Sequence, residues 1–136
     1  MTKLRDLPLR YAILTAALVA VAHTYALFGR GVRSAAMDNM HLYALLLGFV
    51  VFCILALFER ACKADFTKLR LYRLFFNLYN TGLASVLCGK MLIGILEVAG
   101  GSSRYTDWFI TAGYGLCALA MAILLVNLLP HLKKRL

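Results

Sequence analysis

The sequence predicts an all-α integral membrane protein, a four-helix bundle with both termini in the cytoplasm. Two observations carry this prediction: four long apolar runs, and a bias of the basic residues toward alternate connecting segments. Hydrophobic residues make up 62% of the 136-residue chain and charged residues 15%, against about 45–50% and about 25% in ordinary soluble domains. A chain of this length fits one domain, so we expect a single transmembrane domain over residues 1–136.

Each apolar run has the length of a membrane-spanning helix. The runs cover 18 to 25 residues, and a helix that rises about 1.5 Å per residue needs about 20 residues to cross the hydrocarbon core. Among open-ended segments, only a helix satisfies its own backbone hydrogen bonds in lipid. We therefore expect transmembrane helices at residues 9–28, 41–58, 74–98 and 108–129.

The first run also has the layout of a secretory signal. Lys3 and Arg5 precede it, and the Ala-Val-Ala sequence at 20–22 resembles a cleavage site. The run nevertheless continues to Phe28, and three further spans follow it. The chain is therefore predicted to be a multi-pass membrane protein whether or not the first helix is removed.

The basic residues predict the orientation of the spans. Eleven of the fifteen Lys and Arg residues lie in the two terminal segments and in the loop between the second and third runs, whereas three lie in the other two loops. Lys and Arg accumulate on the cytoplasmic side of membrane proteins, which places both termini there. Because helix ends account for the net charge of +9, we expect the lipid bilayer, and no nucleic acid, as a partner.

Lys90 is the one Lys or Arg in the interior of an apolar run, since Arg10 stands at the very start of the first run. A charge near the centre of a transmembrane helix costs about 2.5–3.5 kcal/mol on insertion scales, so such a residue is a candidate for function by default. His23, His41 and Glu97 belong with Lys90 to the outer half of the predicted bundle, and these four form a candidate polar intramembrane site. Three roles stay open for Lys90: a structural or snorkelling residue, a contact between protomers, or a ligand or proton site.

Helical spacing assigns faces to the predicted helices. On the first helix His23 shares a stripe with small alanines, which predicts that it points into the bundle. The third helix carries two polar faces, nearly opposite each other: Asn77, Asn80, Thr81, Ala84 and Cys88 on one, and Lys90, Gly94 and Glu97 on the other. A single neighbour cannot cover both faces, so the helix is either central or in contact with a second protomer.

Three amides are expected to hold helices together. Asn77 and Asn80 lie near the inner end of the third predicted helix, and Asn127 lies near the inner end of the fourth. These two helices are antiparallel neighbours, so hydrogen bonds between their amides would form a polar clamp, and such bonds average about 0.6 kcal/mol in membranes.

Catalytic motifs are not found in the sequence. It contains no hydrolase elbow, zinc-protease helix, phosphate loop or dinucleotide fingerprint, so we expect no enzymatic activity. The predicted role is non-catalytic, as a homo-oligomer or an accessory subunit, without metal or cofactor. The alternative is a haem-binding, metal-binding or small-solute or proton-handling protein built on the candidate site. Two histidines on facing helices, here His23 and His41, are a ligand set that membrane bundles use for haem or metal.

Four stretches of the chain resemble one family. They are Tyr-Ala-Ile-Leu at 11–14, His-Leu-Tyr-Ala-Leu-Leu-Leu-Gly at 41–48, Leu-Phe-Phe-Asn-Leu-Tyr-Asn-Thr-Gly-Leu at 74–83 and Gly-Ile-Leu-Glu-Val at 94–98. Together they resemble an uncharacterised family of small bacterial four-helix integral membrane proteins, catalogued as a domain of unknown function. The resemblance implies the bacterial cytoplasmic (inner) membrane as the location, and it assigns no substrate.

The chain departs from the family's pattern at three positions. Tyr43 stands where the family carries the second histidine of a pair that begins at His41, and Leu116 stands where a further histidine is expected. The basic residue expected near Ile93 is found one turn earlier, at Lys90. The incomplete histidine set makes haem binding less expected here than in the relatives.

Overall fold

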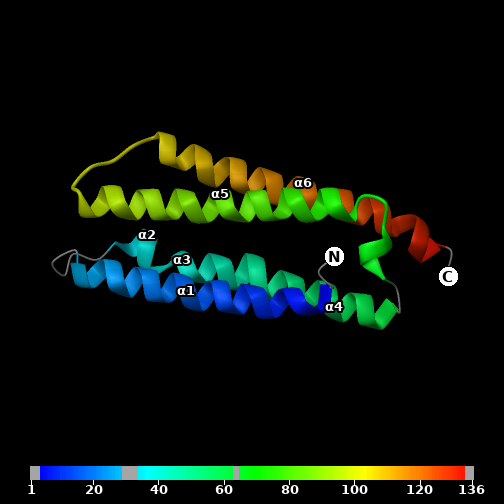
Figure 1. Ribbon diagram of the computed structural model, residues 1–136. Coiled ribbons are helices and arrows are strands. Elements are labelled where there is room, and N and C mark those ends of the chain that lie inside the picture. Colours follow the sequence, from blue (N-terminus) through cyan, green and yellow to red (C-terminus); the bar gives the residue numbers. More distant parts are fainter. Residues whose placement is uncertain (1–3, 29–33, 63–64, 134–136) are drawn as a thin grey trace.

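The computed structural model describes residues 4–28, 34–62 and 65–133, and the regular secondary structure of these ranges is entirely helical. The four long helical segments lie side by side as two hairpins (Figure 1). The described elements are η1 (Leu4–Asp6), α1 (Leu7–Phe28), α2 (Ala35–Asp38), α3 (Met40–Tyr43), η2 (Ala44–Val50), α4 (Val51–Cys62), η3 (Phe66–Lys68), α5 (Tyr72–Val98) and α6 (Tyr105–Lys133). Outside the described residues lie six of the basic residues counted above: Lys3, Arg30, Arg33, Lys63, Lys134 and Arg135.

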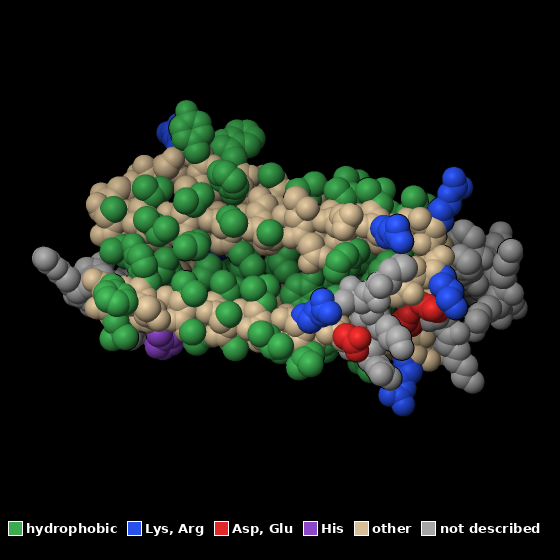
Figure 2. Space-filling model, viewed as in Figure 1, with side chains coloured by type: hydrophobic (Ala, Val, Ile, Leu, Met, Phe, Trp, Pro, Cys, Tyr) green, Lys and Arg blue, Asp and Glu red, His purple; other side chains and the backbone are tan. Residues whose placement is uncertain are grey.

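The first hairpin pairs α1 with the nearly continuous rod that runs from α2 to α4, and the second pairs α5 with α6 (Figure 1). Both chain ends lie where α4 passes to α5, at what we call the N/C end of the bundle. The passage from α5 to α6 lies at the opposite end, which we call the loop end. In Figure 2 the described charged side chains gather mainly at the N/C end, whereas hydrophobic side chains cover the length of the bundle.

The predicted set of four apolar helices is confirmed. Four helical segments are long and apolar enough to cross a membrane: Leu7–Phe28, Ala35–Cys62, Tyr72–Val98 and Tyr105–Leu129. The second begins at Ala35 rather than at residue 41, because Ser34 caps it: the Ser34 hydroxyl accepts a hydrogen bond of 3.3 Å from the Met37 amide. The polar residues Asp38 and Asn39 lower the local hydropathy, so a hydropathy profile places the start of this helix too late.

The middle of the second rod is a π-helix. Its wider turns, η2, contain the Leu47 carbonyl, which accepts a hydrogen bond of 2.6 Å from the Tyr79 hydroxyl of α5. Gly48 in the same segment is buried against Tyr11, and a Cβ there would come within 2.6 Å of the Tyr11 Cδ1 atom. The π-helix therefore gives α1 and α5 a place to dock on the second rod.

An aromatic cluster joins the two hairpins. The ring of Phe52 stacks on Tyr11 with the centroids 4.7 Å apart, and it meets Tyr79 edge to face at 5.4 Å. All three side chains are buried, and Phe75 extends the cluster along α5. Aromatic pairs in these geometries contribute about 0.5–1.5 kcal/mol beyond the area that they bury. The cluster thus fixes which face of α1 turns inward.

The two long helices of the second hairpin cross at a pair of glycines. A Cβ at Gly82 would lie 2.7 Å from the Gly113 carbonyl oxygen, and a Cβ at Gly113 would lie 2.7 Å from the Gly82 carbonyl oxygen. The backbones of α5 and α6 are therefore in direct contact here, in the manner of helices packed through small residues.

Candidate functional site

Lys90 lies on α5 at the loop-end half of the bundle, with its ammonium over the ring of Tyr43. The Nζ atom is 4.7 Å from the ring centroid, and the Lys90 side chain is half-buried. Tyr114 of α6 interacts electrostatically with both side chains. The second rod, α5 and α6 therefore each contribute one residue to a cluster, which we call the Lys90 cluster: Tyr43, Lys90 and Tyr114.

The three members of the Lys90 cluster lie at a common depth. Lys90 is eight residues before the end of α5 at Val98, and Tyr114 is nine residues after the start of α6 at Tyr105. At about 1.5 Å per residue, both lie about 12–14 Å below the loop end. A ring face attracts a cation by about 0.5–1 kcal/mol when exposed and by about 2 kcal/mol when desolvated, so Tyr43 offsets part of the cost of this charge.

Glu97 lies about two helical turns closer to the loop end than Lys90 and makes a different contact. The Ser34 hydroxyl donates a hydrogen bond to the Glu97 carboxylate, and the same hydroxyl caps α2. Gly94 of α5 is buried against Met37 of α2, so the two elements also meet directly here. Glu97 therefore ties the start of the second rod to α5, separately from Lys90.

The two histidines are not brought together with these residues. His23 is exposed on α1, and its Nδ1 atom is 2.9 Å from the Val19 carbonyl oxygen of the same helix. The prediction that His23 points into the bundle is wrong, because the face of α1 that turns inward is the one with Leu7, Tyr11 and Ala22, where Tyr11 joins the aromatic cluster. His41 is half-buried on α3. Among the described residues no group of three or more His, Cys, Asp or Glu side chains is placed to hold a metal ion.

Of the three amides predicted to form a clamp, only Asn80 joins two helices. Asn80 accepts a hydrogen bond from the Tyr11 hydroxyl and donates one of 2.7 Å to the Phe76 carbonyl, so it joins α5 to α1. Asn127 donates a hydrogen bond of 2.8 Å to the Ile123 carbonyl of its own helix, and Asn77 is exposed. The predicted amide clamp between α5 and α6 is therefore not formed. These helices are joined by the glycine crossing and by a hydrogen bond of 2.8 Å from the Ser85 hydroxyl of α5 to the Phe109 carbonyl of α6.

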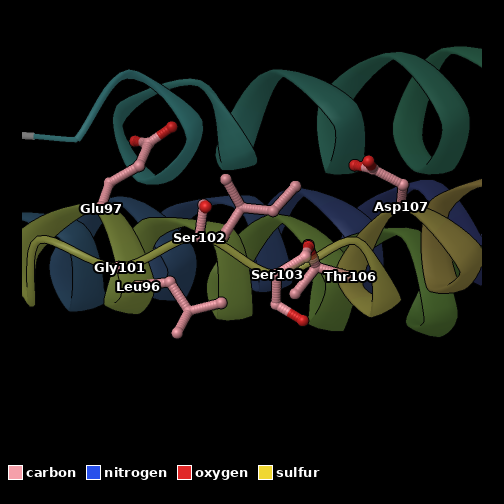
Figure 3. Close-up of a pocket in the computed structure, with 8 residues that line it drawn as sticks. Leu96, Glu97, Gly101, Ser102, Ser103, Thr106 and Asp107 are labelled. Atoms are coloured by element: carbon pink, nitrogen blue, oxygen red, sulfur yellow. The ribbon is translucent and has the colours of Figure 1, made fainter.

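A small cavity opens at the loop end, beside the connection between α5 and α6. Its volume is about 200 Å³, and Figure 3 shows polar side chains around it. Glu97 of α5 and Asp107 of α6 supply carboxylates to the lining, and the other polar lining residues are Ser102, Ser103 and Thr106. In Figure 3 the two carboxylates lie at opposite sides of the cavity rather than facing each other.

Sequence analysis missed Tyr43 and Tyr114 as neighbours of Lys90, and Ser34 as the partner of Glu97. Tyr114 lies six residues into the predicted fourth helix, at a depth of about 9 Å that is close to the depth of Lys90. Tyr43 lies two residues into a helix predicted to begin at residue 41, and only the observed start at Ala35 gives it a comparable depth. No comparable signal pointed to Ser34, because a serine before an apolar run indicates only a helix cap.

The residues brought together here are matched to no characterised site. No curated protein and no solved structure matches the chain. One family profile matches residues 1–135, nearly the whole sequence, which confirms the resemblance to an uncharacterised family. The chain belongs to the family described as "protein of unknown function (DUF2871)".

Proposed function

We propose that this chain is a non-catalytic multi-pass protein of the bacterial cytoplasmic membrane, with both termini in the cytoplasm, that acts as a homo-oligomer or as an accessory subunit of a membrane assembly. Its four apolar helices and its exposed apolar surface support a place in lipid. The charge bias of the connecting segments supports the orientation. The bacterial location rests on the four sequence stretches that resemble the family.

The observation that carries the non-catalytic role is the separate structural contact made by each of three candidate residues. Lys90 lies on the Tyr43 ring, the Ser34 hydroxyl bonds to Glu97, and His23 contacts a carbonyl of its own helix. Converging groups around one reacting atom would support catalysis, whereas these contacts hold helices and helix ends in place. They favour a scaffold whose interactions are with other proteins.

The mass of the purified protein tests this proposal. Light scattering in mild detergent, with the detergent contribution subtracted, is expected to give a multiple of the 15.1 kDa chain, or a complex with a second protein recovered from the native membrane. A chain that stays monomeric over a hundredfold range of concentration, and that co-purifies with no other subunit, would contradict the proposal.

The Lys90 cluster favours a second candidate, the handling of a small solute or proton. The cluster places a half-buried ammonium beside two phenol groups within the predicted membrane, and intramembrane ionisable residues often mark such pathways. Lys90→Leu separates the two functions. Loss of a transport or redox phenotype in a variant that still assembles would support the handling of a solute or proton. A change in assembly or stability alone would support the scaffold.

Haem or metal binding by His23 and His41 is the remaining form of this second candidate. An absorption spectrum of protein purified from haem-replete cells tests it directly. A Soret band that disappears in His41→Ala would place His41 on the iron. A spectrum without such a band, together with elemental analysis that finds no metal, would remove this form.

A further inference from the structure

The outward face of α5 carries a regular stripe of small and polar residues. Asn77, Thr81, Ala84 and Cys88 are all exposed, and they are spaced four, three and four residues apart. The exposed apolar residues Leu74 and Met91 continue the same spacing at either end. An alternation of three and four residues keeps one face of a helix toward a partner helix over several turns. We call these four small and polar residues the α5 stripe.

The polar members of the α5 stripe differ from other polar side chains on the helices. On α5 itself, the Ser85 hydroxyl donates to the Phe109 carbonyl of α6. Other polar side chains bond back to the carbonyl four residues earlier, as seen at Thr15, His23, Thr24, Asn80, Thr111 and Asn127. This local bond removes the need for a partner in lipid. Within the described part of the chain, Asn77 and Thr81 make neither this bond nor any other side-chain hydrogen bond. Their hydrogen-bonding capacity is directed away from the bundle.

In the proposed membrane, Thr81 and Cys88 lie within the hydrocarbon core, where lipid offers no hydrogen bonds, and Asn77 lies just inside its edge. Asn77 and Thr81 are five and nine residues into α5, and Cys88 is sixteen residues into it. At about 1.5 Å per residue these positions are about 7–24 Å from the N/C end of a helix about 40 Å long. An amide or hydroxyl left without a partner in an apolar medium costs several kcal/mol on transfer scales. A partner helix with matching polar groups at the same depth removes that cost.

We propose that the α5 stripe is the interface at which α5 packs in parallel against α5 of a second copy of this chain. Two copies inserted with the same topology present α5 in the same direction, so a twofold axis along the membrane normal places each residue opposite itself. An amide both donates and accepts, so Asn77 satisfies the Asn77 of a second copy; the Thr81 hydroxyl is self-complementary in the same way. Ala84 between them allows a close approach of the backbones.

This interface rests on the proposed homo-oligomer and gives it a specific geometry. On the twofold axis, Cys88 lies opposite Cys88 of the second copy. A disulfide forms when the Cα atoms are about 4.4–6.8 Å apart, a separation that helices packed through small residues reach at the axis. The other described cysteines lie elsewhere: Cys53 and Cys62 on α4, and Cys117 buried against α5. Cys88 therefore reports on this face alone.

Oxidative cross-linking of the full chain in native membranes tests the interface. Copper phenanthroline is expected to yield a dimer that dithiothreitol reverses, that Cys88→Ser abolishes and that Cys53→Ser leaves intact. Ala118→Cys in the Cys88→Ser background controls for random collisions, because Ala118 is exposed on α6 at a comparable depth. This control is expected to cross-link far less than Cys88 does.

A second measurement does not depend on the thiol. Asn77→Leu is expected to raise the dimer dissociation constant in detergent about threefold for each interhelical hydrogen bond lost. Ala118→Leu, which also adds a leucine to an exposed helix face, is expected to leave the constant unchanged. Both substitutions are on exposed positions, and the helical content measured by circular dichroism shows whether each variant folds.

The outcomes separate this inference from the proposed function. A dimeric mass without cross-linking through Cys88, and without an effect of Asn77→Leu, would overturn the α5 interface and leave the homo-oligomer standing. A one-to-one complex with a different subunit would overturn the self-pairing and leave the accessory role. A monomer without any partner subunit would overturn both.

Discussion

Lys90 shows how a single tyrosine changes the cost of a charge in the membrane. The charge costs about 2.5–3.5 kcal/mol near the bilayer centre, and a desolvated cation–π contact returns about 2 kcal/mol. The ring of Tyr43, 4.7 Å from Nζ, therefore compensates for a large part of the charge but not for all of it. Tyr43 stands where the resemblance to the family leads one to expect a histidine, so at this position the chain offers Lys90 the face of a phenol ring.

The first prediction concerns this pair. Tyr43→Leu is expected to lower the free energy of unfolding by about 1–2 kcal/mol, because the ammonium loses the ring face while its desolvation remains. In a Lys90→Leu background the same change is expected to have much less effect. Unfolding in mixed micelles with increasing SDS measures both, and the two variants and their combination complete a double-mutant cycle. Equal effects of Tyr43→Leu in both backgrounds would show that the two side chains are not coupled.

Two tyrosines near the N/C end allow a matched test of one hydrogen bond. The Tyr11 hydroxyl donates to Asn80, whereas the buried Tyr72 hydroxyl has no hydrogen-bond partner among the described residues. Tyr11→Phe is expected to destabilise the fold by about 0.6–1.7 kcal/mol, the range measured for interhelical bonds in membranes, while keeping its stacking on Phe52. Tyr72→Phe is expected to be neutral or stabilising, because it removes an unsatisfied group. SDS unfolding compares them, and a larger loss for Tyr72→Phe would contradict the assignment.

At the scale of the helices, the glycine crossing gives the sharpest prediction. Gly82→Ala places a methyl group 2.7 Å from the Gly113 carbonyl oxygen and from the Cys117 Sγ atom, so α5 and α6 must move apart. Overpacking of this kind costs about 1–3 kcal/mol. Gly115→Ala is the control, because a Cβ there meets nothing within 4 Å, and alanine raises helix propensity by about 1 kcal/mol. Thermal unfolding in detergent is expected to move in opposite directions for these two variants, and equal shifts would contradict the crossing.

Hydropathy predicts the helices because length and apolarity are what lipid requires of a span. It does not predict which face of each helix turns inward, since in lipid both faces are apolar and packing decides. The small-residue stripe on α1 illustrates the limit: Ala16, Ala20 and His23 are exposed, because Tyr11 stacks on Phe52 from another side of the helix. On α5 the two polar faces were predictable from spacing alone, and the structure places Lys90 and Gly94 toward the bundle and Asn77 toward the outside.

The polar contacts were less predictable than the faces. Spacing brought Asn80 and Asn127 to similar depths, yet each amide bonds to the carbonyl four residues earlier on its own helix. This local alternative is open to every short polar side chain on a helix, and only the tertiary structure shows which of them gain a second partner. Asn80 does so because Tyr11 reaches it across the aromatic cluster, a contact between residues that are 69 positions apart.

For the whole molecule, the two hairpins give a simple relation between fold and orientation. Each hairpin begins and ends at the N/C end. The side of the membrane on which that end lies therefore sets the direction of all four spans. The N/C end carries most of the described charged side chains in Figure 2, and basic segments are retained on the cytoplasmic side. The α5 stripe then extends from near the N/C end to past the middle of the span, and Lys90 lies just beyond it toward the loop end.

Thiol labelling of intact cells tests that orientation. Ser102→Cys places a thiol in the exposed connection between α5 and α6, and Lys68→Cys places one in the exposed segment before α5 at the N/C end. A membrane-impermeant maleimide is expected to label the first variant in intact cells and the second only after permeabilisation, because the proposed orientation places the basic N/C end in the cytoplasm. The unsubstituted chain gives the background from its native cysteines. Labelling of Lys68→Cys but not of Ser102→Cys in intact cells would show the opposite orientation. The Lys90 cluster would then lie in the cytoplasmic half of the membrane.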